Sequence, residues 1–179
     1  MALTYQQQDV DKTVLEAARQ IANAARTAPK AKGEDNLVIA VADREEIGKI
    51  AKVMIELNEK GCAGDSFVRD AENLLVSQAL VLIGTKIAAI GLDCGLCGFE
   101  NCADKQARPS VPCAFNTHDL GIAVGSAAAM AADMRIDNRV MYSAGVAVCE
   151  MGLLGKDVHM VMGLPLCVSS KSPYFDRNK

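Results

Sequence analysis

The stretch "HDLGIAVGSAAAMAADMRI", residues 118–136, decides how the rest of this chain has to be arranged. Its pattern predicts a long helix, and small side chains such as Gly121, Gly125 and Ala132 occupy nearly all of its faces. Small residues allow two backbones to approach closely. We therefore expect this helix to lie at the centre of the domain or at a subunit interface, with other elements packed around it.

The segments before this helix alternate between helical and strand-like patterns. Residues 12–28 carry a helical apolar stripe, and Pro29 ends it. Residues 37–42, "LVIAVA", and 79–86, "ALVLIGTK", are short apolar runs that are typical of buried strands. Between these runs a helix begins after Asp43, whose carboxylate we expect to accept hydrogen bonds from first-turn amides.

Three further elements complete the pattern. Helices are expected over about residues 68–76 and 139–150, and a strand within residues 156–170. Strands and helices interleaved in this way predict a layered sheet-and-helix domain of the α/β or α+β class, and we favour α+β. The chain contains no internal repeat or linker, so residues 1–179 are expected to form a single domain.

The overall composition narrows the possible functions. The 179 residues carry a net charge of -3 and include no Trp, which argues against a nucleic-acid binder because neither phosphate-neutralising charge nor stacking platforms are in excess. No stretch reaches the roughly 20 unbroken apolar residues of a membrane helix. The polar N-terminus does not resemble a signal peptide. We expect a cytoplasmic protein whose thiols stay reduced.

Four of the seven cysteines lie within one short segment, "GLDCGLCGFENCADKQARPSVPCAF", residues 91–115. Their spacing is Cys94-x2-Cys97-x4-Cys102-x10-Cys113. Three explanations are open: a disulfide, a zinc ion or an iron–sulfur cluster. An odd number of cysteines in a reducing compartment makes disulfides the weakest of the three.

The residues between these cysteines favour an inorganic cluster. Gly95 and Gly98 permit tight turns and let backbone amides approach the sulfurs. A short helix after Cys102 would point its N-terminus at the site, where negative charge is favoured. Structural zinc sites usually pair two two-residue knuckles, and the second pair is absent here. We therefore favour a [4Fe-4S] cluster bound within residues 92–115, with a structural zinc module as an alternative.

This segment resembles a known [4Fe-4S] domain with the pattern C-G-x-C-G-[FY]-x-x-C followed by a more distant cysteine. That resemblance implies that Cys94, Cys97, Cys102 and Cys113 are the ligands. In the common form of the domain a proline follows the last cysteine, whereas here Pro112 precedes it.

Nearly the whole chain is similar to a family of uncharacterised bacterial and archaeal proteins described as containing a ferredoxin domain. The stretches "AARTAPKAKGEDNL", "GLDCGLCGFENC", "DLGIAVGSAAAMA" and "GLPLCVSSKSPYFDR" carry this similarity. Outside the cysteines the pattern resembles a shortened nitroreductase fold. That resemblance implies an FMN-binding homodimer whose long central helices pack across the two-fold axis.

No residue is assigned to FMN. The turn that would lie near the flavin ring in a nitroreductase reads "APKAKG", residues 28–33, and lacks the serine and asparagine of the family's turn. Arg26, Lys30 and Lys32 are candidates to bind a phosphate, or they form a solvated basic loop. Of the remaining cysteines, Cys62, Cys149 and Cys167 are expected to be structural.

These observations lead to a primary hypothesis and to one further alternative, in addition to the structural zinc module. The primary hypothesis is a [4Fe-4S] protein that transfers electrons to a redox partner protein or a flavin, without contact with nucleic acid or membrane. The alternative is a nitroreductase-like flavin oxidoreductase with an auxiliary cluster. Since no catalytic constellation stands out, enzymatic activity is left open.

Overall fold

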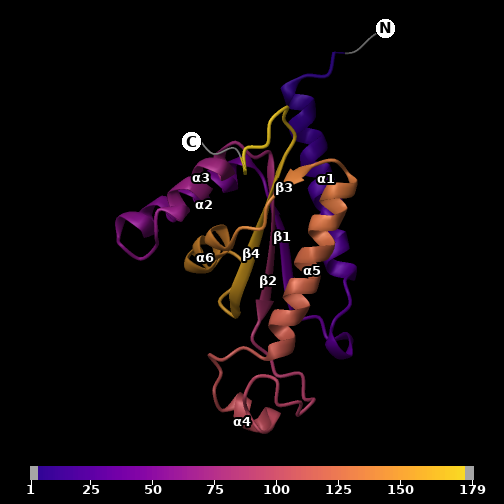
Figure 1. Cartoon of the computed structure of the whole chain (residues 1–179), viewed down its shortest axis with the longest axis vertical. Helices are drawn as coiled ribbons and strands as arrows, with labels where there is room; N and C mark the ends of the chain where they lie inside the picture. Colours follow the sequence, from indigo (N-terminus) through magenta and orange to yellow (C-terminus); the bar gives the residue numbers. More distant parts are fainter. Residues whose placement is uncertain (1–3, 176–179) are drawn as a thin grey trace.

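A computed structural model describes residues 4–175 of the chain; residues 1–3 and 176–179, the polar ends, lie outside the described residues. A four-stranded sheet forms the middle layer, and every pair of neighbouring strands is antiparallel (Figure 1). In the order β1-β2-β4-β3, the strands span Leu37–Ala42, Ala79–Lys86, Val158–Cys167 and Asp137–Asn138. The expected α+β class is confirmed.

Two long helices, α1 (Gln7–Thr27) and α5 (Ala114–Asp133), cover one face of the sheet (Figure 1). Their apolar residues and those of the sheet form one hydrophobic core. The hydroxyl of Ser126 on α5 donates to the carbonyl of Ala24 on α1 over 2.8 Å, which joins the two helices where their small residues meet. The opposite side of α5 is exposed at Gly121 and Gly125.

Three helices cover the other face: α2 (Arg44–Glu59), α3 (Ser66–Leu75) and α6 (Tyr142–Met151). They share a second hydrophobic core with the sheet. The Asp43 carboxylate accepts a hydrogen bond from the Glu46 amide over 3.0 Å, so the expected N-terminal cap of α2 is confirmed.

Helix α6 lies unusually close to β4 because of one glycine. A Cβ atom placed on Gly145 would lie 1.8 Å from the carbonyl oxygen of Val161. No side chain fits there, so this approach depends on the missing Cβ rather than on an unusual backbone conformation.

The C-terminal segment after β4 is held against the α3 side of the domain by Tyr174. This side chain is buried, and its hydroxyl lies 2.9 Å from the hydroxyl of Ser77. The carbonyl of Tyr174 also accepts a hydrogen bond from Arg139 over 3.3 Å. Burial raises the pKa of the Tyr174 phenol, and the hydrogen bond with Ser77 only partly offsets that effect.

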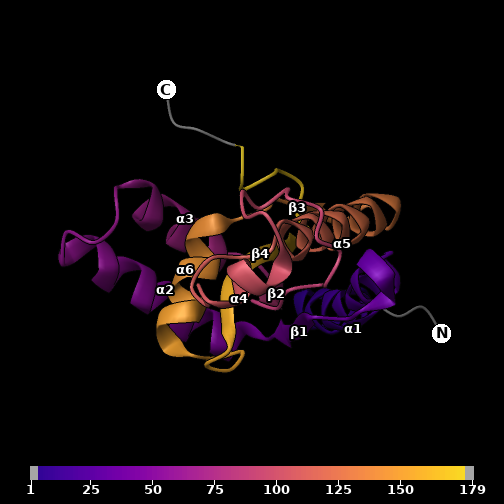
Figure 2. The ribbon, with the colours of Figure 1, turned by 90° about the horizontal axis from the view of Figure 1, so that it is seen from below.

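Residues 87–113 connect β2 to α5 and lie beyond one end of the sheet (Figure 1). They contain the five-residue helix α4 (Cys102–Gln106). Figure 2, drawn from that end, shows α4 and its flanking loops in front of the layers. A short 3-10 helix, η1 (Ala31–Gly33), follows α1. Within the described part of the chain, no helix is both long and apolar enough to span a membrane.

Candidate iron–sulfur site

The four cysteines of the motif are positioned by different local structures. Cys94 and Cys97 lie in the loops before α4, Cys102 is the first residue of α4, and Cys113 is the N-cap of α5. All four are free thiols. Cys113, which is separated from Cys102 by ten residues, lies at the same end of the domain as the triplet.

The four cysteines line a single pocket. Their exposure falls from Cys94, which is exposed, through the half-buried Cys97 and Cys102, to Cys113, which is only 5% exposed. The remaining walls are mainly apolar, with contributions from Ile90, Leu92, Phe99 and Phe115. Sulfur ligands in apolar surroundings, open to solvent on one side, are typical of a site that holds a cluster near the protein surface.

The backbone around the triplet requires residues that tolerate a left-handed conformation. Gly95 and Gly98 have φ values of 70° and 85°, and the amide of Gly98 donates to the carbonyl of Gly95 over 2.9 Å. Asp93 also has a positive φ, 45°, which is uncommon for a residue with a side chain. The two glycines thus serve the tight turns expected of them.

Asp93 fixes Cys102 through two reciprocal hydrogen bonds. The amide of Asp93 donates to Sγ of Cys102 over 3.4 Å, and the amide of Cys102 donates to Oδ1 of Asp93 over 2.6 Å. An amide directed at a cysteine sulfur stabilises its thiolate form. Asp93 was not predicted as part of the site, although it directly precedes the first cysteine in the sequence.

Helix α4 also carries a residue of the pocket that was not predicted from the sequence. Lys105 is 3% exposed and lines the same pocket as the cysteines. It follows Cys102 by three residues, and residues three apart on a helix lie on the same face. This three-residue spacing from Cys102 was the sequence signal that could have identified Lys105.

The four thiols of this pocket are the groups that could hold a metal ion or a cluster. Within residues 4–175, no three His, Cys, Asp or Glu side chains converge closely enough to hold a single ion. Zinc needs its thiolates about 2.3 Å from one centre. A cubane cluster takes one thiolate at each of its four irons. Cys94, Cys97, Cys102 and Cys113 are the residues that would hold it.

Two cations of the basic loop are engaged by the chain itself. Arg26 pairs with Asp35 over 2.5 Å, and the ammonium group of Lys30 donates to the carbonyls of Arg26 and Ala28 over 2.6 and 2.8 Å. Burial opposes ionisation of Asp35, but hydrogen bonds from Arg26 and a backbone amide outweigh it and lower the pKa of this carboxyl. In this arrangement Arg26 and Lys30 stabilise the end of α1.

The third cation links the turn after α1 to the cysteine segment. Lys32 donates to the carbonyl of Ile90 over 3.1 Å. On the other side of the same turn, the amide of Ala31 donates to both carboxylate oxygens of Asp119, at 3.2 and 3.1 Å. The turn at residues 28–33 therefore contacts both the cysteine segment and the first half of α5.

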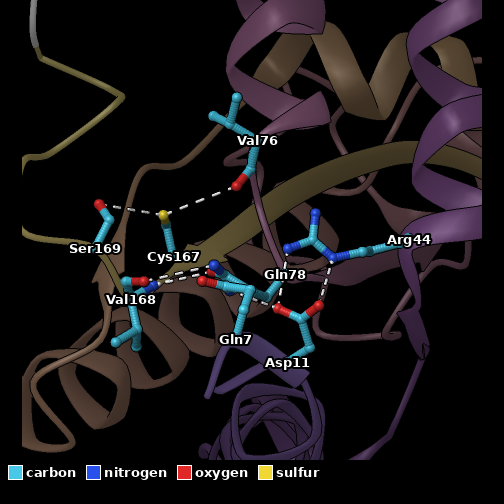
Figure 3. Close-up of polar contacts among 8 residues, drawn as sticks. All are labelled: Gln7, Asp11, Arg44, Val76, Gln78, Cys167, Val168 and Ser169. Atoms are coloured by element: carbon cyan, nitrogen blue, oxygen red, sulfur yellow. Dashed lines mark hydrogen bonds and ion pairs between the residues drawn. The ribbon is translucent and has the colours of Figure 1, made fainter. Parts of the chain in front are cut away.

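The other cysteines lie away from this pocket. Sγ of Cys167 lies 4.0 Å from the carbonyl oxygen of Val76 and 3.7 Å from the hydroxyl of Ser169 (Figure 3). Burial raises the pKa of both the Cys167 and the Cys149 thiols, which favours their protonated form. Cys62 is exposed in the loop after α2. None of the three lines the pocket of the motif cysteines.

The comparisons with solved structures define the class of fold. A nitroreductase family protein from Clostridium novyi NT aligns with a TM-score of 0.61 and 16% identity, covering 90% of this chain and 76% of its own. A BluB-like flavoprotein from Clostridium difficile 630 aligns at 0.56 and 19%, covering 88% and 84%. An NADPH:FMN oxidoreductase from Vibrio harveyi aligns at 0.56 and 12%, covering 91% and 61%. The chain has a nitroreductase fold.

The comparisons of sequence define the family. A sequence model of a protein family, described as an uncharacterized protein containing a ferredoxin domain, matches residues 110–177. These residues include Cys113 but not the triplet. An uncharacterized protein from Archaeoglobus fulgidus is 47% identical over 169 residues, covering 90% of both chains. This chain belongs to that family of uncharacterised ferredoxin-domain proteins, as its motifs predicted.

Proposed function

We propose that this protein binds a [4Fe-4S] cluster through Cys94, Cys97, Cys102 and Cys113 and transfers single electrons. The observation that carries the proposal is that the four thiols, drawn from three local structures, line one pocket. When bound, the cluster supplies reversible one-electron chemistry. The chain's family, described as containing a ferredoxin domain, supports the same function.

The residues around the pocket would bind the cluster and shield it. The four thiolates supply one sulfur ligand to each iron. The amide of Asp93 stabilises charge on the sulfur of Cys102. The apolar side chains of Ile90 and Phe99 keep water from the inner side of the pocket, while the exposed Cys94 marks the side from which a partner approaches.

The surface beside the exposed side of the pocket indicates the kind of partner. Asp93, Glu100 and Asp104 are exposed there, together with the apolar side chain of Leu96. A cluster with four thiolates adds further negative charge. The partner is therefore expected to present a basic patch to this end of the domain.

A second candidate function is flavin reduction on the same scaffold. It is favoured by the nitroreductase fold and by the hydrogen bond from Lys32 to Ile90, which joins the turn near a nitroreductase's flavin to the cysteine segment. A solved structure of this fold is titled an oxidoreductase containing FMN. In this candidate function, the cluster would pass electrons to FMN held by the same protein.

The proposed assembly is a homodimer formed through α5. Its outer side exposes Gly121, Gly125 and Ala129, one small residue per turn, and this spacing permits close helix packing. A cytoplasmic location is expected from the reduced thiols that such a site requires.

One experiment separates these functions and the zinc alternative. The full chain is purified without oxygen, and iron, sulfide, zinc and flavin are quantified on the same sample. Four irons and four sulfides per chain, with absorbance that bleaches on adding dithionite, support the electron carrier; flavin retained after desalting supports the reductase. Zinc without iron or sulfide would replace both with a structural zinc module.

A further inference from the structure

Lys105 is a buried lysine on α4. Lysine is almost never fully buried unless it is paired with an opposite charge, yet this side chain is 3% exposed. Among the described residues, no carboxylate lies within 4.0 Å of its ammonium group. No carboxylate of the described residues therefore neutralises this charge directly.

The local structure fixes Lys105 beside the cysteines. It lies three residues after Cys102 on α4, and its amide donates to the carbonyl of Asn101 over 3.3 Å. The side chain of Asn101 caps the same helix by accepting from the amide of Asp104 over 2.9 Å. The short helix is therefore anchored at its start, and Lys105 is directed to the same face as Cys102.

Lys105 also differs in charge from everything else around the pocket. Among the described residues that line it, Lys105 is the only basic side chain and Asp93 the only acidic one. One oxygen of Asp93 already accepts from the amide of Cys102. The groups available to balance the lysine are thus the four cysteines, once they are thiolates.

We propose that Lys105 is the internal counter-cation of the cluster and raises its reduction potential. The inference rests on the proposed function and deepens it. In the one-electron step, the [4Fe-4S] unit goes from an oxidised 2+ to a reduced 1+ core, with the electron supplied by a one-electron donor. With four thiolates, the total charge of the site changes from -2 to -3. A cation held beside the cluster stabilises the more negative state more than the less negative one.

The competing explanation is that only the alkyl chain of Lys105 matters, as a packing element that covers the cysteines. The two explanations differ in what a change of charge at constant length does. If Lys105 acts through its charge, methionine lowers the potential and arginine preserves it. If it acts by packing, methionine preserves the potential.

The test uses the full chain, purified without oxygen, as wild type and as Lys105→Met, Lys105→Arg and Arg108→Gln. Arg108 is a matched control because it is a cation in the same segment but exposed to solvent. Iron and sulfide are quantified for each protein. The midpoint potential is then measured in a mediator titration with dithionite, followed by electron paramagnetic resonance of the reduced cluster.

We expect Lys105→Met to shift the midpoint to a more negative value, by more than Arg108→Gln does, and Lys105→Arg to stay near wild type. If Lys105→Met loses the cluster, a loaded Lys105→Arg protein with a wild-type potential still supports the role of the charge. A loaded Lys105→Met protein with an unchanged potential overturns the inference. Loss of the cluster in both variants, or a displaced potential in Lys105→Arg, also overturns it. A wild-type protein without iron and sulfide would instead refute the proposed function itself.

Discussion

Asp93 and Cys102 are joined by a reciprocal pair of hydrogen bonds, in which each backbone amide donates to the other residue's side chain. Replacing Asp93 with Ala removes the acceptor for the Cys102 amide and places Ala in a left-handed conformation, at a combined cost of about 1–2 kcal/mol in that segment. We expect Asp93→Ala to retain less iron than wild type after desalting. Asp93→Asn keeps the acceptor oxygen and tolerates this conformation, so it should retain nearly the wild-type amount. Equal iron contents in all three proteins would contradict this role.

Cys97 and Cys62 lie in different environments, so replacing each of them tests which cysteines bind iron. Cys97 lines the pocket of the motif cysteines, whereas Cys62 lies in an exposed loop after α2. We expect Cys97→Ser to lose most of the iron, the sulfide and the visible absorbance, because a serine oxygen is a poor replacement for a thiolate at iron. Cys62→Ser should keep all three. An unchanged iron content in Cys97→Ser would refute the ligand assignment.

Gly145 and Gly48 are both helical glycines, but their surroundings differ. A Cβ on Gly145 would lie 1.8 Å from the Val161 carbonyl oxygen, whereas nothing lies within 4 Å of a Cβ on Gly48. Gly145→Ala should lower the free energy of unfolding by about 3 kcal/mol or more. Gly48→Ala should raise it by about 0.5–1 kcal/mol, since alanine favours helix. Urea unfolding followed by circular dichroism measures both; similar stabilities for the two variants would show that α6 and β4 are not in such close contact.

Burial of Tyr174 predicts a loss of stability in alkali. Its pKa is raised in the folded state above the usual 10.0, so the folded protein resists ionisation that the unfolded chain allows. The contribution of the protonated Tyr174 to the free energy of unfolding is complete below about pH 10. It is lost as the pH rises further, by up to about 1.4 kcal/mol per pH unit. Tyr174→Phe should be about 1 kcal/mol less stable at pH 7 but should lose less stability between pH 9 and pH 11. Identical pH profiles for the two proteins in thermal unfolding would contradict this.

The exposed side of α5 tests the proposed homodimer. Because nothing lies within 4 Å of a Cβ on Gly125, a glutamate there would be tolerated by the isolated chain. In a dimer packed through α5, the same glutamate would be buried without a partner, and we expect Gly125→Glu to be monomeric by light scattering. Gly48→Glu, on α2, should keep the wild-type mass. A monomeric wild type, or a Gly125→Glu protein of unchanged mass, would refute this interface.

Much of the fold was predictable because the strands are apolar runs between clear turn signals. The expected strands at residues 37–42 and 79–86 match β1 and β2 to the residue. Helix starts were less predictable. We expected one helix from residue 12, and α1 begins at Gln7, because its first turn is polar and shows no apolar period. The two-residue strand β3 was too short to leave a sequence pattern.

The central helix illustrates the same limit near the site. It was expected from residue 118, but α5 begins at Ala114, directly after Cys113. His118, expected near the start of this helix, therefore lies inside it and is exposed. The sequence "CAFN" carries no Ser, Thr or Asp in the cap position, so nothing marked the boundary.

Within the candidate site, the spacing of the cysteines and the role of the glycines followed from the sequence, since tight turns depend on residues that are close along the chain. The position of Lys105 beside the cysteines could not be predicted from the sequence. A lysine in a polar stretch is normally solvated, and its burial depends on how α4 lies against the segment before it. How one segment packs against another in the folded chain cannot be read from the pattern of neighbouring residues in the sequence.

The cysteine segment is attached to the domain without being part of its interior. Among the described residues, neither hydrophobic core includes any member of residues 87–113; both are formed by the sheet, the five long helices and other segments, among them the C-terminal one with Tyr174. We therefore expect the sheet and its helices to fold without the proposed cluster. If the proposed cluster binds in this peripheral pocket, biogenesis would separate into two stages, synthesis of the folded chain and later delivery of the cluster, and a chain that loses its cluster to oxidation would be open to reloading.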